Sequence, residues 1–200
     1  MFVVGITGAI ATGKSTLSRF LKEKGAIVID ADKIAKELLD TPALGKKVLT
    51  AFGQGIMTDN TIDRKKLGSI VFSNTLKLDR LNKLLLPEII KVIEEELSLY
   101  SKTLPNNQIL VLDAPLLIEA NLLPKVDYVI VVTASPELQL ERLLSKNLTI
   151  KESRERMGAQ IKEEARLKHA DVVIKNDSDI GNFKQKTEKL WQDLQKKSRL

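Results

Sequence analysis

The chain has 200 residues, 43% of them hydrophobic, which suffices for one α/β domain with insertions and argues against a disordered protein. It has no cysteine, which excludes disulfide bonds and cysteine-ligated metal and fits the reducing cytoplasm. The N-terminus lacks the pattern of a signal peptide, and Asp113, Pro115 and Glu119 interrupt the apolar stretch 109–123, so we expect no membrane span.

The net charge of +6 is partly local, because basic residues crowd the segment 142–168. Nucleic acid is one partner that such a charge could attract. The segment also carries glutamates, however, and it has almost no aromatic residue on which a base could stack. We therefore favour phosphate groups held within a site over nucleic acid.

The first predicted element is a buried strand, residues 2–6, which leads through a glycine loop into a helix over 15–24. The loop, residues 8–15, reads G-x-x-x-x-G-K-S, which is the phosphate-binding loop in its usual strand–helix context. Its glycines let backbone N–H groups point at a polyphosphate, and the following helix adds its positive end. In this motif Lys14 reaches the β- and γ-phosphates, and the Ser15 hydroxyl holds Mg²⁺. The motif predicts a nucleoside triphosphate but not the reaction.

A second strand is predicted over residues 25–30, followed by a helix from 33 to 39. Asp30 and Asp32 are two residues apart, so on an extended strand end their side chains would share one side, at the sheet edge where ligands bind. A carboxylate there could act as the general base for an alcohol that accepts a phosphoryl group. The alternative is a strand-end turn that happens to contain aspartate.

No strand-like run appears between residues 44 and 101, where the pattern predicts helices around 44–52, 64–72, 75–86 and 87–100. Pro87 is suited to be the first residue of the last helix. This pattern indicates a helical insertion between the second and third strands. In kinases with such an insertion it usually holds the phosphate acceptor, and a purely structural role is the open alternative.

Three more strands complete the predicted fold, at residues 109–113, 128–132 and 171–174. The first of these strands ends in Asp113, at the usual Walker B position. The last is followed by Asn176. The fold is therefore predicted to be α/β, a five-stranded parallel sheet of the P-loop NTPase type flanked by helices. The basic segment up to residue 168 is predicted to be a helical lid.

The final helix is predicted to pack against the core through an apolar stripe, with a membrane-surface role for its lysines as the alternative. The stripe consists of Phe183, Thr187, Leu190, Trp191 and Leu194.

Two features of the sequence count strongly against a regulatory GTPase. The third strand continues as Asp113-Ala114-Pro115-Leu116 instead of Asp-x-x-Gly, and the base-reading sequence Asn-Lys-x-Asp is absent. A shikimate-type kinase also has Asp-x-Asp after its second strand, but it lacks the long helical insertion. Another small-molecule kinase therefore remains the alternative to the family described next.

Several segments resemble the dephospho-CoA kinase family, in order and at the expected separations. They are the phosphate loop and residues 28–35, 112–119, 139–143 and 170–176. The resemblance covers nearly the whole chain, and its most specific parts are Asp-Ala-Asp at 30–32 and Asp-x-Pro-Leu-Leu at 113–117. It implies a cytoplasmic enzyme that phosphorylates the ribose 3′-hydroxyl of dephospho-CoA with ATP, the last step of coenzyme A synthesis. It also implies a five-stranded core, a helical CoA-binding domain and a lid.

The resemblance implies a division of the chain and of its partners. The nucleotide-binding core would comprise 1–43 and 102–200, with a lid at about 140–168, and the CoA-binding insertion would comprise 44–101. The partners would be ATP and dephospho-CoA, with neither nucleic acid nor membrane, and we expect a monomer or a weak oligomer.

The resemblance also implies roles for individual residues. Asp32 would be the catalytic base, assisted by Lys14 and Arg142; the alternative is that Asp32 binds metal or holds the turn while Asp30 or Asp113 acts as base. ATP would be bound by Ala11, Thr12, Gly13, Lys14, Ser15, Thr16, Arg142 and Asn176. The acceptor would be bound by Thr7, Asp32, Arg64 and Leu116. Mg²⁺ would be bound by Ser15 and Asp113.

The sequence departs from the family pattern at five positions. Ala9 and Ala11 replace two loop glycines, Lys36 and Lys146 replace two arginines, and Leu86 replaces a histidine. The loop changes are mild if the backbone φ angles there are negative. The lysines lose bidentate binding of phosphate, and Leu86 changes a detail of the expected acceptor pocket.

Overall fold

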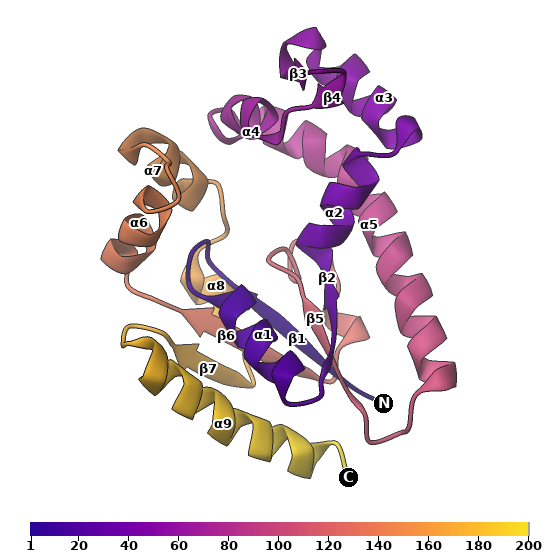
Figure 1. Ribbon diagram of the computed structural model, residues 1–200, viewed down its shortest axis with the longest axis vertical. Coiled ribbons are helices and arrows are strands. Elements are labelled where there is room, and N and C mark those ends of the chain that lie inside the picture. Colours follow the sequence, from indigo (N-terminus) through magenta and orange to yellow (C-terminus); the bar gives the residue numbers. More distant parts are fainter. Residues whose placement is uncertain (200) are drawn as a thin grey trace.

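A five-stranded parallel sheet forms the centre of the protein, which a computed structural model describes over residues 1–199 (Figure 1). The strands lie in the order β2-β5-β1-β6-β7. Their bounds are Phe2–Gly8 for β1, Ile27–Asp30 for β2, Ile109–Asp113 for β5, Tyr128–Thr133 for β6 and Val172–Lys175 for β7. The predicted five-stranded parallel sheet is therefore confirmed. Because β1 is the middle strand, the phosphate loop that follows it starts at the centre of the carboxyl edge.

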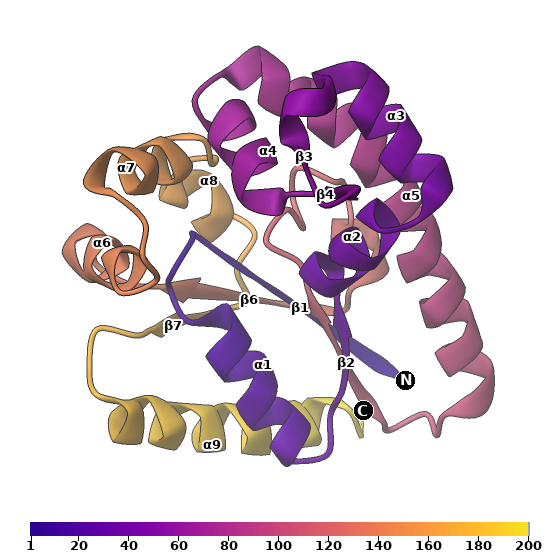
Figure 2. The ribbon, with the colours of Figure 1, turned by 45° about the horizontal axis from the view of Figure 1, so that its top comes forward.

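Helices cover both faces of the sheet, which explains why its strands are almost continuously apolar. The helices α1 (Lys14–Glu23) and α9 (Ile180–Lys197) pack on one face, where Leu17 and Phe183 join a core with Val4 and Ile6 of β1. Figure 2 shows α1 and α9 together on this side. The apolar stripe predicted for the last helix is buried in this core.

Helices of the segment between β2 and β5 pack against the other face of the sheet. This segment contains α2 (Ala31–Leu39), α3 (Pro42–Phe52), a 3₁₀ turn (Gln54–Ile56), β3 (Met57–Thr58), β4 (Thr61–Ile62), α4 (Arg64–Phe72) and α5 (Thr75–Thr103). The expectation that residues 44–101 contain no strand is wrong, because β3 and β4 form a small antiparallel hairpin. Its two turn residues, Asp59 and Asn60, have φ angles of 47° and 62°, a conformation that Asp and Asn tolerate.

The two helices predicted at 75–86 and 87–100 are one helix, α5, with Pro87 inside it. Proline removes one backbone hydrogen bond, but buried side chains four residues apart continue through it. They are Leu81, Leu85, Ile89 and Ile93. The packing of this stripe keeps the chain helical across the proline, so Pro87 is not the first residue of a helix.

A 3₁₀ turn (Leu123–Lys125) precedes β6. The segment between β6 and β7 contains α6 (Pro136–Leu144), α7 (Ile150–Gly158) and α8 (Glu163–Leu167). Ser135 caps α6, since its hydroxyl accepts a hydrogen bond from the N–H of Leu138. Helix α7 lies beside α4 of the insertion (Figure 2), with the Arg156 guanidinium 4.9 Å from the centre of the Phe72 ring. Within residues 1–199, no helix is both long and apolar enough to cross a bilayer.

Candidate active site

The phosphate loop joins the end of β1 to the start of α1 and folds around the side chain of Lys14. The Lys14 ammonium donates to the carbonyls of Gly8 at 2.8 Å and Ala9 at 2.9 Å, and the Thr12 hydroxyl also donates to Ala9 at 2.9 Å. A Cβ atom on Gly8 would collide with the carbonyl of Val132 in the neighbouring strand. The glycine here is required because the loop leaves the sheet in close contact with β6.

The backbone at Ala11 has a φ of +61°, whereas Ala9 does not have a positive φ. An alanine in the left-handed region costs about 1–2 kcal/mol, because its Cβ approaches a carbonyl oxygen. Replacing glycine by alanine is mild only where φ is negative, so the change is mild at Ala9 but not at Ala11. The alanine at position 11 strains the loop locally.

Asp30, Asp32 and Asp113 come from two adjacent strand ends at the carboxyl edge. The expectation that Asp30 and Asp32 lie on one extended strand end is wrong, because α2 begins at Ala31. Asp30 instead caps this helix, accepting a hydrogen bond from the N–H of Lys33 at 2.9 Å. Because Asp30 caps α2, the chain is already helical at Asp32, which lies in the first turn of this helix.

The charges of Asp32, Asp113 and Lys14 act on one another at this edge. Burial raises the pKa of Asp113 to about 6, against the hydrogen bond that Ser18 donates to it at 2.7 Å and the charge of Lys14. Burial lowers the pKa of Lys14 to about 8, against the charges of Asp113 and Asp32. Asp32 is exposed at the rim, yet desolvation by its surroundings raises its pKa, against the charge of Lys14. The edge therefore combines one buried cation with carboxylates that accept protons readily.

A cavity of about 300 Å³ opens beside the phosphate loop and is lined in part by Ser15, Ser18, Asp30 and Asp113. Hydroxyl and carboxylate oxygens are suitable ligands for Mg²⁺, which is usually held by one or two carboxylates together with substrate phosphates. In residues 1–199 no group of three or more His, Cys, Asp or Glu side chains is arranged to hold a metal by itself. The donor set fits a Mg²⁺ ion that arrives with a nucleotide.

Arg142 and Asn176 hold the outer side of the phosphate loop. Arg142, on α6, donates from Nη1 to the carbonyl of Ala11 at 3.1 Å and from Nη2 to the carbonyl of Asn176 at 2.9 Å. Asn176, just after β7, donates from Nδ2 to the carbonyl of Thr12 at 2.8 Å, and it leaves no space for a Cβ on Gly13. A contact between Arg142 and a transferring phosphoryl group stays a prediction.

The remaining predicted residues differ in their surroundings. Ser15 is exposed in the first turn of α1, and the N–H of Thr16 donates to the carbonyl of Gly13. Thr7 is fully buried and donates to the carbonyl of Pro115 at 3.1 Å, whereas Leu116 is half-buried in the loop after β5.

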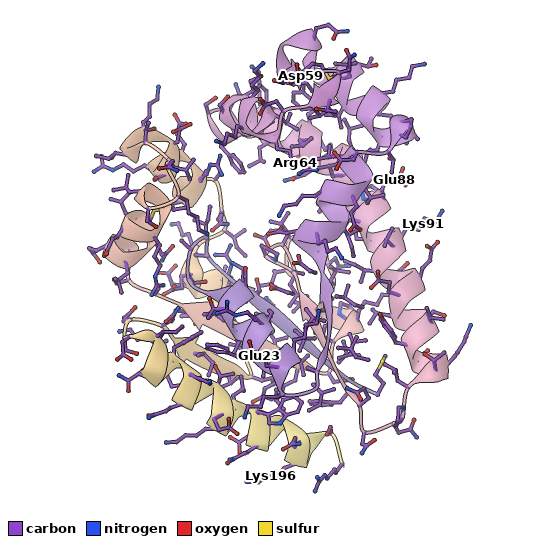
Figure 3. The ribbon with its side chains drawn as sticks, in the orientation of Figure 1. Glu23, Asp59, Arg64, Glu88, Lys91 and Lys196 are labelled. Carbon is purple, nitrogen blue, oxygen red and sulfur yellow. The ribbon has the colours of Figure 1, made fainter. Side chains whose placement is uncertain are left out.

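Arg64 lies in the insertion, apart from the phosphate loop (Figure 3). Its Nη2 atom is 2.6 Å from a carboxylate oxygen of Asp40, at the end of α2. The predicted contacts of Thr7, Leu116 and Arg64 with an acceptor stay predictions, and in this arrangement Thr7 would have to move to make one.

Sequence reasoning missed two residues of the site. Ser18 lies four residues after Lys14 on α1, so the helical period could have indicated that it faces the same edge. Gln160, in the lid segment, accepts a hydrogen bond from the N–H of Ile10 at 2.8 Å. The two residues are 150 positions apart, and no local pattern indicates this contact.

Comparison with known proteins identifies the family of this chain. The family model described as Dephospho-CoA kinase matches residues 2–182. The Dephospho-CoA kinase of Carboxydothermus hydrogenoformans is 42% identical, covering 98% of both chains, and that of Fusobacterium nucleatum is 36% identical, covering 97% of this chain and 99% of the relative. The solved structure of Dephospho-CoA kinase from Campylobacter jejuni has a TM-score of 0.69 at 32% identity, covering 97% of each chain. The chain therefore belongs to the dephospho-CoA kinase family.

Proposed function

We propose that the protein transfers the γ-phosphoryl group of ATP to the ribose 3′-hydroxyl of dephospho-CoA, giving coenzyme A in the last step of its synthesis. Its family membership makes the chain a P-loop kinase that uses ATP, and its relatives match it over nearly their whole length. The observation that carries the proposal is the placement of Lys14 and Asp32 in the first turns of α1 and α2, the helices that follow β1 and β2 at the carboxyl edge of the sheet.

Lys14 and the loop N–H groups would bind the phosphates of ATP, because Lys14 is a buried cation in the first turn of α1 and the N-terminus of a helix carries a partial positive charge. The cation would stabilise the charge that spreads over the phosphoryl oxygens in the transition state. Arg142 and Asn176 would hold the loop in the conformation that binds ATP.

Asp32 would accept the proton of the 3′-hydroxyl and aim its oxygen at the γ-phosphorus. The alternatives are weakened by hydrogen bonding, since Asp30 caps α2 and Asp113 is bound by Ser18. Within residues 1–199, by contrast, the Asp32 carboxylate accepts no hydrogen bond. Desolvation raises the pKa of Asp32, which makes its carboxylate a better proton acceptor.

Ser15 and Asp113 would hold Mg²⁺, directly or through water, in the cavity beside the loop. The ion, when bound with ATP, supplies positive charge that neutralises the phosphate oxygens. A chelator should therefore abolish phosphoryl transfer, and added Mg²⁺ should restore it.

The insertion would form the acceptor-binding part of the enzyme, with the core at 1–43 and 102–200 and the lid at about 140–168. Both proposed boundaries of the insertion 44–101 fall inside helices, α3 and α5, so the two parts share continuous elements. The further proposals are a monomer or weak oligomer without nucleic acid as a partner, and a cytoplasmic location, which the absence of cysteine supports.

A coupled assay of ADP release with dephospho-CoA, shikimate and nucleosides as acceptors tests the proposal. Dephospho-CoA should be used with a kcat/KM at least about 100-fold above that of any other acceptor, since a site built for one substrate leaves polar groups unpaired with another. The product should co-elute with coenzyme A, and 3′-deoxy-dephospho-CoA should give no ADP. Faster turnover of shikimate or a nucleoside would contradict the proposal.

A further inference from the structure

Arg166 is a buried cation that the roles described so far leave unused. It lies on α8, at the C-terminal end of the lid, and its side chain is only 1% exposed. A buried guanidinium is costly unless its donors are paired. Its contacts therefore indicate what it could bind.

The guanidinium is only partly paired. Its Nη1 atom donates to the carbonyl of Ile161 at 2.8 Å, and its Nη2 atom lies 3.6 Å from a carboxylate oxygen of Glu119, beyond hydrogen-bonding distance. Within the described residues, Nε and Nη2 of Arg166 and both carboxylate oxygens of Glu119 are buried without a hydrogen-bond partner. The Nε–Nη2 edge is the two-pronged donor that arginine uses for carboxylates and phosphates, and it is free.

This free edge lies in the segment that borders the phosphate loop. Gln160, six residues before Arg166, accepts the N–H of Ile10 in the loop, and α8 packs against β1, the strand that leads into the loop. Glu119 belongs to the loop after β5, the strand that ends in Asp113. The charge of Arg166 contributes to lowering the pKa of Lys14, which agrees with this proximity.

Stability alone does not account for the Arg166–Glu119 pair. A buried ion pair that is not closed by hydrogen bonds is commonly no more stable than apolar residues of similar volume. Arg142, the other arginine beside the loop, already donates from Nη1 and Nη2 to backbone carbonyls. Arg166 thus keeps its whole Nε–Nη2 edge without a hydrogen bond, whereas Arg142 is held to the backbone at both Nη atoms.

We propose that Arg166 binds the transferring γ-phosphoryl group of ATP, donating from Nε and Nη2 to its oxygens while Glu119 balances the charge of the guanidinium before ATP binds. The inference rests on the ATP site of the proposed function. Two donors on the γ-phosphoryl oxygens would hold the group for in-line transfer and stabilise the charge that develops on it.

The test compares binding of ADP with binding of AMPPNP, a non-hydrolysable ATP analogue, by calorimetry without acceptor. The main variant is Glu119→Leu/Arg166→Met, which replaces the whole pair by apolar side chains and so leaves no unpaired buried charge to unfold the protein. We expect its affinity for AMPPNP to fall at least about 10-fold and that for ADP to stay within about threefold, because only AMPPNP carries a γ-phosphate. We also expect kcat to fall about 100-fold or more.

Two further variants separate binding from anchoring. Glu119→Gln keeps the arginine and breaks the ion pair, so it should keep a larger preference for AMPPNP over ADP than the double variant. Arg154→Met removes an exposed arginine of α7 and serves as the matched control. Equal losses for ADP and AMPPNP in the double variant, or an equal loss of preference in Glu119→Gln, would overturn the proposal and leave the pair as an anchor of the lid. The acceptor assay on the unmutated enzyme reports separately on the proposed function.

Discussion

Asn176 and Thr12 lie 164 residues apart in the sequence and are joined by a 2.8 Å hydrogen bond from the Asn176 side-chain amide to the Thr12 carbonyl. Asn176 also accepts a hydrogen bond from Arg142 through its own carbonyl. The loop after β7 and the lid helix α6 are therefore both attached to the phosphate loop. A substitution at Asn176 should therefore weaken the binding of ATP.

Asn176→Ala should raise the KM for ATP several-fold and lower the free energy of unfolding by about 1 kcal/mol, because the Thr12 carbonyl loses a buried hydrogen bond. Steady-state kinetics and thermal unfolding measure the two effects, with the exposed Asn107→Ala as control.

We also expect Asn176 to lie near the adenine. A structure with bound ADP that places residues 174–178 far from the base would reject that assignment.

Lys14→Ala should lower phosphoryl transfer by about 100-fold or more while the fold survives, because the cation that meets the developing charge is lost. The exposed Lys22→Ala on the same helix provides the control. ADP release and far-UV circular dichroism measure activity and fold. Near wild-type turnover by a folded Lys14→Ala would remove Lys14 from the site.

Asp32→Asn should lose roughly 10²–10⁴-fold in kcat, the usual effect of removing a general base, with little change in affinity for ATP. Asp30→Asn is a close control, since asparagine also caps a helix well and can accept the bond from Lys33. Both variants are measured by ADP release with dephospho-CoA. Turnover within a few-fold of the wild type, or loss of Mg²⁺–ATP binding, would show that Asp32 is not the base.

Ala11→Gly and Ala9→Gly should have opposite effects on stability. Glycine relieves the left-handed strain at position 11, and we expect a gain of about 0.5–1 kcal/mol there. At position 9, where φ is not positive, glycine only adds freedom to the unfolded chain and should cost about 0.4–1 kcal/mol. Urea unfolding measures both. A loss of stability in both variants would show that Ala11 is unstrained.

The unfolding free energy should depend on pH through Asp113 when divalent cations are removed with EDTA. Its pKa is about 6 in the folded protein and 3.8 ordinarily, so the folded state favours the protonated form. The stabilising contribution is full below about pH 4, declines as pH rises to about 6, and amounts to about 3 kcal/mol.

Asp113→Asn removes this dependence on pH. The stability of Asp113→Asn relative to the wild type should therefore increase as the pH rises from about 4 to 7. Thermal unfolding at fixed ionic strength measures this difference. The exposed Asp59→Asn (Figure 3) should show no such pH-dependent gain. A constant difference between Asp113→Asn and the wild type across this range would contradict the raised pKa.

The sequence predicted the elements whose signals are local. The third core strand, Ile109–Asp113, and the helix Arg64–Phe72 were predicted with the bounds that the structure has. Strands covered on both faces are apolar runs, and surface helices repeat their apolar residues every three to four positions, so both can be seen within a short window. The phosphate loop is also local, because its function depends on eight consecutive residues.

Only the tertiary structure decided how distant segments meet. Leu85 and Ile89 pack against the core on either side of Pro87, and this burial overrides the local signal for a helix start. The contacts of Ile10 with Gln160, and of Glu119 with Arg166, depend on where the lid comes to rest on the sheet edge. Local propensities constrain neighbouring residues in the chain, whereas these side chains are brought together by packing, and packing is a property of the whole fold.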